Sequence, residues 1–235
     1  MLLTVTEVEH YTDRLFRIRT ERPQSFRFSA GEFTMIGLPD GSITRAYSFT
    51  SGPGDDYLEF YSIKVPDGPL TSKLQHIQVG DQLSVSDRTS GTLTLANIEL
   101  GGDLWLLATG TGIAPFISIL RDPDTYDCFD NIHVAWSVRT RDELTSYSDF
   151  INEMPVEFTP IVTQDKTWTG FNKRITTKIS SGILLPKLDP SKNKVMICGS
   201  LSFNNEVKII LKEYKWNEGN KRTAGTFLQE KAFVG

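Results

Sequence analysis

Three neighbouring side chains in the first half of the sequence could bind a flat, phosphorylated ligand. Arg45, Tyr47 and Ser48 fall in the run RAYSF, which we expect to end a strand. An arginine guanidinium is a planar set of donors that matches the oxygens of a pyrophosphate. Because alternate residues of a strand face the same way, Tyr47 would present its ring for stacking beside Arg45, with the Ser48 hydroxyl next to it. Taken alone, the run fits equally well an exposed arginine and a tyrosine of the core.

A glycine turn that leads into a helix forms a second candidate site. An expected strand at residues 59–65 runs into PDGPLTSKL, with Thr71 and Ser72 in the first turn of a short helix expected within residues 68–77. Free backbone N–H groups at the start of a helix attract anions. In isolation, an ordinary capped helix is the simpler interpretation.

Small residues in the second half could let a nucleotide approach the backbone. Residues 109–112 (TGTG) join an apolar strand to an apolar helix, which exposes a helix N-terminus to a phosphate. Two glycines fall short of the complete GxGxxG pattern, so this turn is a weak indication by itself. Cys198 ends a later strand, where the ligands of open α/β sheets collect. A lone buried cysteine is nevertheless more often core packing.

The elements that position these residues change along the chain. Up to residue 99, short and partly alternating apolar runs are separated by turn residues such as Pro23 and Gly41, and further strands are expected at residues 57–65 and 81–86. This spacing predicts a small antiparallel β-barrel.

The second half alternates strands with helices. Strands are expected at residues 104–108, 131–137, 157–163 and 194–198, and helices at residues 114–120, near 141–150 and at 203–215. This alternation predicts a parallel sheet with helices on its faces. The polar stretch 97–103 is the natural boundary, so we expect domains at residues 1–99 and 100–235.

Composition argues against several other classes of protein. The 235 residues are 39% hydrophobic and 23% charged, and a net charge of −4 disfavours nucleic-acid binding through bulk charge. Cys128 and Cys198 are the two cysteines, too few to ligate an iron–sulfur cluster or a zinc finger, and we expect no metal site. No apolar run is long enough to span a membrane, and the N-terminus is unlike a signal peptide. We therefore expect a cytoplasmic monomer that binds neither membranes nor nucleic acid.

Six segments together resemble the ferredoxin–NADP reductase family, closely its bacterial type. No single motif is diagnostic, but the six occur in order over nearly the whole chain: RAYSF (45–49), EFYSIKVPDGPLTSKL (59–74), GTL (91–93), LLATGTGIAPFISIL (106–120), VMICGS (195–200) and EKAFVG (230–235). The resemblance implies an FAD-binding barrel followed by an NADP-binding α/β domain, with a C-terminal tail that returns to the FAD.

The resemblance also assigns contacts to FAD. Arg45 would hold the pyrophosphate, Tyr47 would stack on the flavin, and Ser48 would hydrogen-bond near flavin N5. Ala232 would lie by the flavin face and Phe233 near the adenine. Further FAD contacts would come from Ala46, Phe60, Tyr61, Ser62, Ile63, Lys64, Leu70, Thr71, Ser72 and Thr111.

For NADP(H), the resemblance places Cys198 beside the nicotinamide, so that Ser48 and Cys198 are the expected catalytic residues. Arg139 and Arg174 would bind the 2′-phosphate. The expected NADP-binding residues are Gly110, Thr111, Gly112, Arg139, Arg174, Cys198 and Gly199.

The chain departs from its family where the nucleotide should be recognised. Gln164 stands where an arginine is usual, and Lys173 stands where a glycine is usual. We therefore expect a preference for NADPH that is narrower than usual. The alternative is that Arg174 is a solvated loop residue and that Lys166 or Lys173 reads the phosphate.

The function expected is electron transfer between NADP(H) and a ferredoxin or flavodoxin through FAD. Two alternatives stay open: a reductase component of an oxygenase or a free-flavin reductase, and a non-catalytic subunit of a larger complex. The arginines of the first strands could form a docking face for an acidic carrier, although such charge runs are usually solvated: Arg14, Arg17, Arg19, Arg22 and Arg27.

Overall fold

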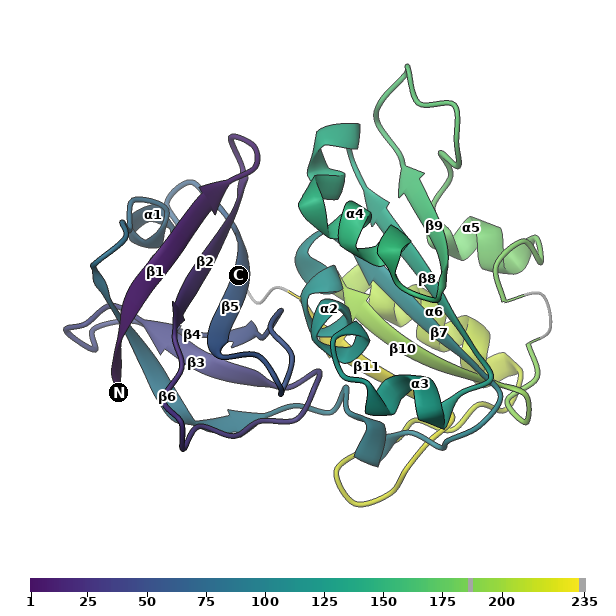
Figure 1. Ribbon diagram of the computed structural model, residues 1–235. Coiled ribbons are helices and arrows are strands. Elements are labelled where there is room, and N and C mark those ends of the chain that lie inside the picture. The colour runs from purple at the N-terminus through teal and green to yellow at the C-terminus, as the bar shows by residue number, and fades with distance from the viewer. Residues whose placement is uncertain (186–187, 233–235) are drawn as a thin grey trace. The chain divides into compact units, whose positions relative to one another are not determined.

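The computed structural model describes residues 1–185 and 188–232 (Figure 1). Contacts divide the chain into two units. The first comprises Met1–Gly91 and Ala114–Asp122, and the second comprises Thr92–Ile113 and the described residues from Pro123 onward. In the part of the chain so described, no helix is long and apolar enough to cross a membrane.

The first unit is built on a six-stranded sheet in which every strand pairing is antiparallel. Its strands follow the order β4-β3-β6-β1-β2-β5. A bridge between Phe49 and Phe60 joins the two ends of that order, which closes the sheet. The predicted antiparallel barrel is therefore confirmed. The elements are β1 (Leu2–His10), β2 (Leu15–Glu21), β3 (Phe33–Gly37), β4 (Thr44–Ser48), β5 (Tyr57–Ile63), α1 (Thr71–Leu74) and β6 (Gln82–Ser90).

The barrel is filled by the inward side chains of its strands. Phe16, Ile18 and Phe60 have no exposed surface, and the rings of Phe28 and Phe49 stack 4.1 Å apart. Full burial of each such side chain stabilises the fold by about 1.5–3 kcal/mol. The same packing holds the neighbouring strands β4 and β5, which carry the predicted flavin contacts.

The apolar helix α2 (Ala114–Leu120) belongs to the first unit although it follows the glycine turn of the second. All seven of its residues are buried. The Ser118 hydroxyl donates to the carbonyl of Ser51 at 2.7 Å, and Arg121 donates to the Tyr57 hydroxyl at 3.0 Å. A helix without a polar face has to be buried on every side, which fits this environment.

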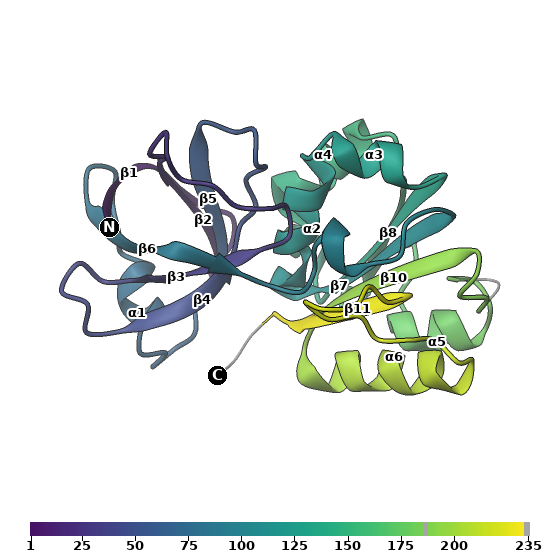
Figure 2. The ribbon, with the colours of Figure 1, turned by 90° about the horizontal axis from the view of Figure 1, so that it is seen from below.

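The second unit is a five-stranded parallel sheet in the order β11-β10-β7-β8-β9, as predicted for this half. Figure 2 shows α5 and α6 on one face of the sheet and α3 and α4 on the other. The elements are η1 (Leu95–Asn97), β7 (Asp103–Thr109), η2 (Gly110–Ile113), α3 (Asp124–Cys128), β8 (Asn131–Val138), η3 (Arg141–Leu144), α4 (Thr145–Glu153), β9 (Glu157–Val162), α5 (Ile175–Ser180), β10 (Asn193–Gly199), α6 (Leu201–Glu213) and β11 (Phe227–Lys231).

Burial of the central strands explains their composition. Every residue of β10 is buried, as expected for a parallel strand that is covered on both faces. Ile175 and Ile179 of α5 share one apolar cluster with Phe203 and Val207 of α6. The helices are thus held against the sheet, and the turns at its carboxyl edge are fixed in place.

Candidate functional site

The predicted flavin-binding residues of β4 become more buried along the strand, from exposed Arg45 and Ala46 to half-buried Tyr47 and Ser48. Arg45 is exposed, and its guanidinium donates to the carbonyl of Thr44 at 2.9 Å. Tyr47 is half-buried, with its ring edge-on to Phe60 at 6.4 Å and its hydroxyl 3.0 Å from the Ser62 hydroxyl. The structure therefore brings Tyr47 together with two predicted residues of β5.

The chemistry of Tyr47 follows from this environment. Burial raises the pKa of its phenol, against the smaller opposing effects of the Ser62 hydrogen bond and the Arg45 charge. The phenol is therefore uncharged at neutral pH, and its ring offers an apolar face next to a cationic group. An exposed guanidinium beside a fixed aromatic ring suits a ligand with a pyrophosphate and a flat ring system, so these residues fit FAD.

Gly68, in the turn between β5 and α1, leaves no room for a side chain. A Cβ on Gly68 would lie 2.3 Å from the Thr71 hydroxyl oxygen, which in turn accepts the Val65 amide at 3.3 Å. No side chain caps α1. Leu70 is buried in the core, whereas Thr71 and Ser72 are half-buried. Backbone groups and two hydroxyls are therefore what this turn can offer an anion.

The remaining predicted flavin contacts in the first unit lie on the same two strands. Ala46 is exposed and Ser48 is half-buried on β4; Tyr61 is buried on β5, whose last residue is Ile63. The Lys64 ammonium donates to the carbonyl of Thr12 at 3.2 Å.

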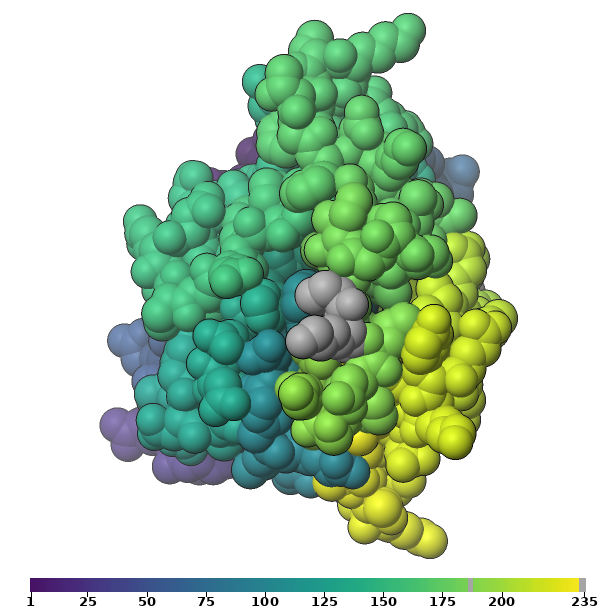
Figure 3. All heavy atoms as spheres, turned by 90° about the vertical axis from the view of Figure 1, so that its right-hand side faces the viewer, coloured from purple at the N-terminus to yellow at the C-terminus, as the bar shows by residue number. Residues whose placement is uncertain are grey.

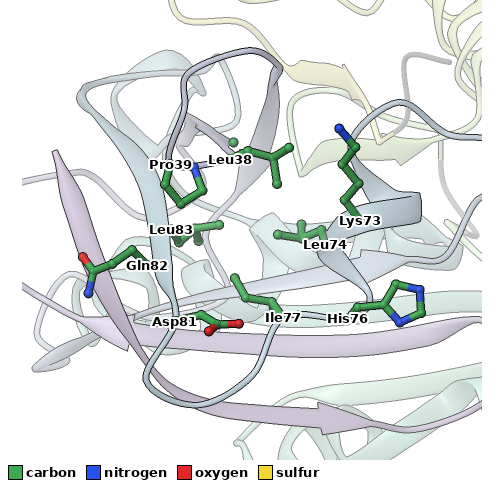
Figure 4. Close-up of a pocket in the computed structure, with 10 residues that line it drawn as sticks. Leu38, Pro39, Lys73, Leu74, His76, Ile77, Asp81, Gln82 and Leu83 are labelled. Carbon is green, nitrogen blue, oxygen red and sulfur yellow. The ribbon is translucent and has the colours of Figure 1, made fainter.

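A cavity of about 260 Å³ lies beside α1 in the same unit. Figure 4 shows Leu38, Leu74, Ile77 and Leu83 around it, with Lys73 extending from α1. None of the residues predicted to contact FAD lines this cavity. It is a separate feature of the barrel.

In the second unit, the glycine turn η2 packs directly on the end of β10. A Cβ on Gly112 would lie 2.2 Å from the carbonyl oxygen of Cys198, and one on Gly199 would lie 2.2 Å from the Thr109 hydroxyl oxygen. Gly110 adopts a φ of +53°, which favours glycine. Larger residues would push these segments apart. The glycines thus leave bare backbone at the carboxyl edge of the sheet, which is where a nucleotide binds in such folds.

Cys198 is a buried, uncharged thiol. It is 1% exposed, and burial, with a smaller effect of the Glu230 charge, raises its pKa. A thiol in this environment does not act as a thiolate nucleophile. At 1% exposure it presents almost no surface to a ligand in this structure, so its contact with the nicotinamide stays a prediction.

Glu230 is a carboxyl group that the sequence analysis did not single out, although it lies within the EKAFVG segment. It is the register partner of Cys198 across the parallel pair β10–β11. Its carboxylate accepts hydrogen bonds from the Thr92 amide and, at 3.0 Å, from the Thr92 hydroxyl. Burial outweighs these bonds and raises its pKa. A carboxyl group with a raised pKa therefore adjoins the predicted nicotinamide contact.

The tail is held against β10 as far as the structure describes it. The Ala232 amide donates to the carbonyl of Gly199 at 3.0 Å, and the Asn204 side chain donates to the carbonyl of Glu230 at 2.7 Å. Phe233 lies outside the described residues, so its predicted contact with adenine stays a prediction.

The two arginines predicted to bind phosphate lie in different surroundings. Arg139 is exposed directly after β8, and its carbonyl accepts the Gln164 amide at 2.8 Å. Arg174 is the residue before α5, and its guanidinium pairs with Glu206 at 2.8 Å. The backbone of residue 164 therefore lies directly beside that of Arg139.

Three of the five arginines of the predicted docking face are engaged by other groups of the first unit. Arg17 is 6% exposed and pairs with Glu7, Glu9 and Glu59. Arg19 pairs with Glu7 and Glu59, and Arg22 donates to backbone carbonyls of residues 26, 53 and 55. The register explains the ion pairs of Arg17 and Arg19, because β1 and β5 place glutamates opposite these two residues of β2.

Comparison with known proteins places the chain in a family. Residues 1–91 match the oxidoreductase FAD-binding domain, and residues 106–208 match the oxidoreductase NAD-binding domain. Ferredoxin–NADP reductase A of Sorangium cellulosum is 41% identical over 251 residues, covering 99% of this chain and 90% of that protein. The flavodoxin/ferredoxin–NADP reductase of Rhodobacter capsulatus is 42% identical over 252 residues, covering 99% and 93%.

Solved structures agree with this assignment. A ferredoxin NADP⁺ reductase from Neisseria gonorrhoeae, solved with bound FAD and NADP, superposes with a TM-score of 0.92 at 30% identity. The match covers 99% of this chain and 98% of that one. The chain thus belongs to the ferredoxin–NADP reductase family.

Proposed function

We infer that this protein is an FAD-dependent reductase that transfers electrons between NADP(H) and ferredoxin or flavodoxin. The observation that carries the inference is near-full-length similarity to reductases of that name, including one solved with both nucleotides. The pairing of exposed Arg45 with the fixed ring of Tyr47 supports it independently. The monomeric state and the cytoplasmic location expected from the sequence stay predictions.

When bound, FAD supplies the redox chemistry, because it can exchange a hydride with a nicotinamide and single electrons with a carrier. The residues of the first unit would bind and orient it. Arg45 would neutralise the pyrophosphate, Tyr47 would hold the ring system by stacking, and Ser48 would offer a hydroxyl near the reacting edge.

The residues of the second unit would hold the nicotinamide nucleotide. Gly110 and Gly112 would let it approach the backbone, and Cys198 would provide an apolar, uncharged contact for the nicotinamide ring. An uncharged thiol suits this role because it neither repels a hydride donor nor reacts with it.

The test is reduction of the purified holoenzyme with NADPH, followed by separate addition of ferredoxin, flavodoxin and free FMN. Electron transfer to ferredoxin or flavodoxin with steady turnover is the expected result. Turnover with free FMN alone would instead show a flavin reductase. A colourless protein that cannot be reconstituted with FAD would contradict the proposal.

A further inference from the structure

The surface formed by α5 and α6 carries a charge pair held by the core beneath it. Ile175 and Ile179 of α5 pack with Phe203 and Val207 of α6 in one apolar cluster. Figure 3 shows this side of the second unit, with α5 in green beside α6 in yellow-green. The packing fixes the backbone on which the charged residues stand.

Both oxygens of the Glu206 carboxylate are engaged from the α5 side. One pairs with the Arg174 guanidinium at 2.8 Å, and the other accepts the Thr176 hydroxyl at 3.2 Å. The side chains of Arg174 and Glu206 are 60% and 39% exposed, so a dissolved anion can reach the pair. Arg174 is therefore partly neutralised before any ligand arrives.

Arg174 and Glu206 lie at the edge of the sheet where a nucleotide is expected to bind. Arg174 immediately precedes α5, and Glu206 is in the second turn of α6, which begins after the carboxyl end of β10. Ligands of open α/β sheets bind at that edge. Anything that binds Arg174 there meets the charge of Glu206 as well.

We propose that Glu206 is a built-in counter-ion of Arg174 that competes with the 2′-phosphate of NADP(H) and so limits the preference for NADPH over NADH. This rests on the proposed function and on the predicted role of Arg174 as a contact of that phosphate. The phosphate has to displace the carboxylate or share the guanidinium with it, and the two anions repel each other. NADH, which lacks the phosphate, leaves the pair intact.

The size of the effect is limited by exposure. Ion pairs between solvent-exposed groups are weak because water screens them, so removing the carboxylate should strengthen phosphate binding by about 2- to 5-fold. The gain should shrink at high ionic strength, since both the competition and the attraction are electrostatic.

The experiment is calorimetric titration of the FAD-loaded protein with 2′,5′-ADP and, separately, with 5′-AMP. These probes differ only in the 2′-phosphate. Glu206→Gln should bind 2′,5′-ADP about 2- to 5-fold more tightly and 5′-AMP as the wild type does. In an Arg174→Ala background, Glu206→Gln should change neither affinity.

Glu218→Gln is the matched control. Glu218 also pairs with a cation of α6, Lys208 at 2.7 Å, but it bridges to Phe227 at the start of β11. The substitution Glu218→Gln changes the net charge by the same amount as Glu206→Gln. It should leave both affinities unchanged at about 0.15 M salt, where the Debye length is roughly 8 Å.

The outcomes separate this inference from the proposed function. Unchanged or weaker 2′,5′-ADP binding in Glu206→Gln would overturn the inference, as would a gain that persists without Arg174. If Arg174→Ala bound 2′,5′-ADP as tightly as the wild type, the placement of Arg174 in the phosphate site would fall, and the inference with it.

Discussion

Cys198 and Glu230 lie directly opposite each other on the parallel strands β10 and β11. Burial raises the pKa of both groups, and the Glu230 charge further raises that of the thiol. The thiol at the carboxyl end of β10 is therefore uncharged.

Replacing Cys198 should slow the hydride step more than it weakens FAD binding. In Cys198→Ala the nicotinamide loses its contact at the end of β10, and imprecise placement of reacting groups should slow flavin reduction on the order of 10-fold. Stopped-flow reduction by NADPH measures this rate, and fluorescence titration measures the FAD dissociation constant. Cys128→Ala, at the half-exposed second cysteine, is the control. A Cys198→Ala enzyme that is reduced at the wild-type rate would assign this residue to packing.

Tyr47 should contribute to FAD binding through the stacking of its ring. Tyr47→Ala should raise the FAD dissociation constant by about 2- to 10-fold, because aromatic stacking contributes about 0.5–1.5 kcal/mol. Tyr47→Phe keeps the ring and loses the contact with Ser62, so it should bind FAD nearly as the wild type does. Equal weakening in both variants would show that the hydroxyl, and not stacking, holds the flavin.

Glu59 should control the acid stability of the first unit. Its carboxylate is fully buried and accepts hydrogen bonds from Arg17, Arg19 and Thr50 at 2.6–2.8 Å. Burial disfavours its charge, but these bonds outweigh burial and lower the pKa from 4.5. Its contribution to stability is therefore complete above about pH 4.5 and is lost as the pH falls through the lower, folded-state pKa.

Urea unfolding of the wild type and of Glu59→Gln between about pH 3 and pH 7 tests this, because glutamate titrates within that range. Loss of one partner from a buried ion pair should cost about 3 kcal/mol at neutral pH, and the variant should lose less stability than the wild type on acidification. Glu21→Gln, at an exposed glutamate that accepts the Thr4 amide, should change little. If the free energies of unfolding of the wild type and of Glu59→Gln changed in parallel with pH, Glu59 would have no part in the loss of stability in acid.

Gln164 should weaken the preference for NADPH over NADH, because it stands beside Arg139 without a charge. Gln164→Arg should raise the ratio of kcat/KM for NADPH over NADH by about 10-fold or more, since a hydrogen bond to a charged group contributes roughly 1.5–3 kcal/mol. The substitution should raise kcat/KM for NADPH and leave kcat/KM for NADH unchanged. Gln24→Arg adds the same charge to an exposed loop of the first unit and should leave the ratio unchanged. A wild type that prefers NADH would contradict this assignment.

Local residue patterns were sufficient to predict the two kinds of sheet. Alternating apolar runs and turn residues predicted the barrel, and the strand–helix alternation predicted the parallel sheet. Both predictions were possible because the spacing of apolar residues along an element reflects whether one or both of its faces are buried. The motifs around Arg45, Thr71, Gly112 and Cys198 were also visible, since the chemistry of a nucleotide site demands particular residue types at short spacing.

The contacts between residues far apart in the sequence became visible only in the folded chain. Nothing local indicates that α2 packs with the first unit, that Arg17 and Arg19 are neutralised across strands by Glu7 and Glu59, or that Glu206 engages Arg174. The edge strand β11, which sets Glu230 opposite Cys198, was likewise missed. Periodicity records which face of an element is buried, whereas the partner of that face depends on strand order and register, which are settled by contacts between segments far apart in the chain.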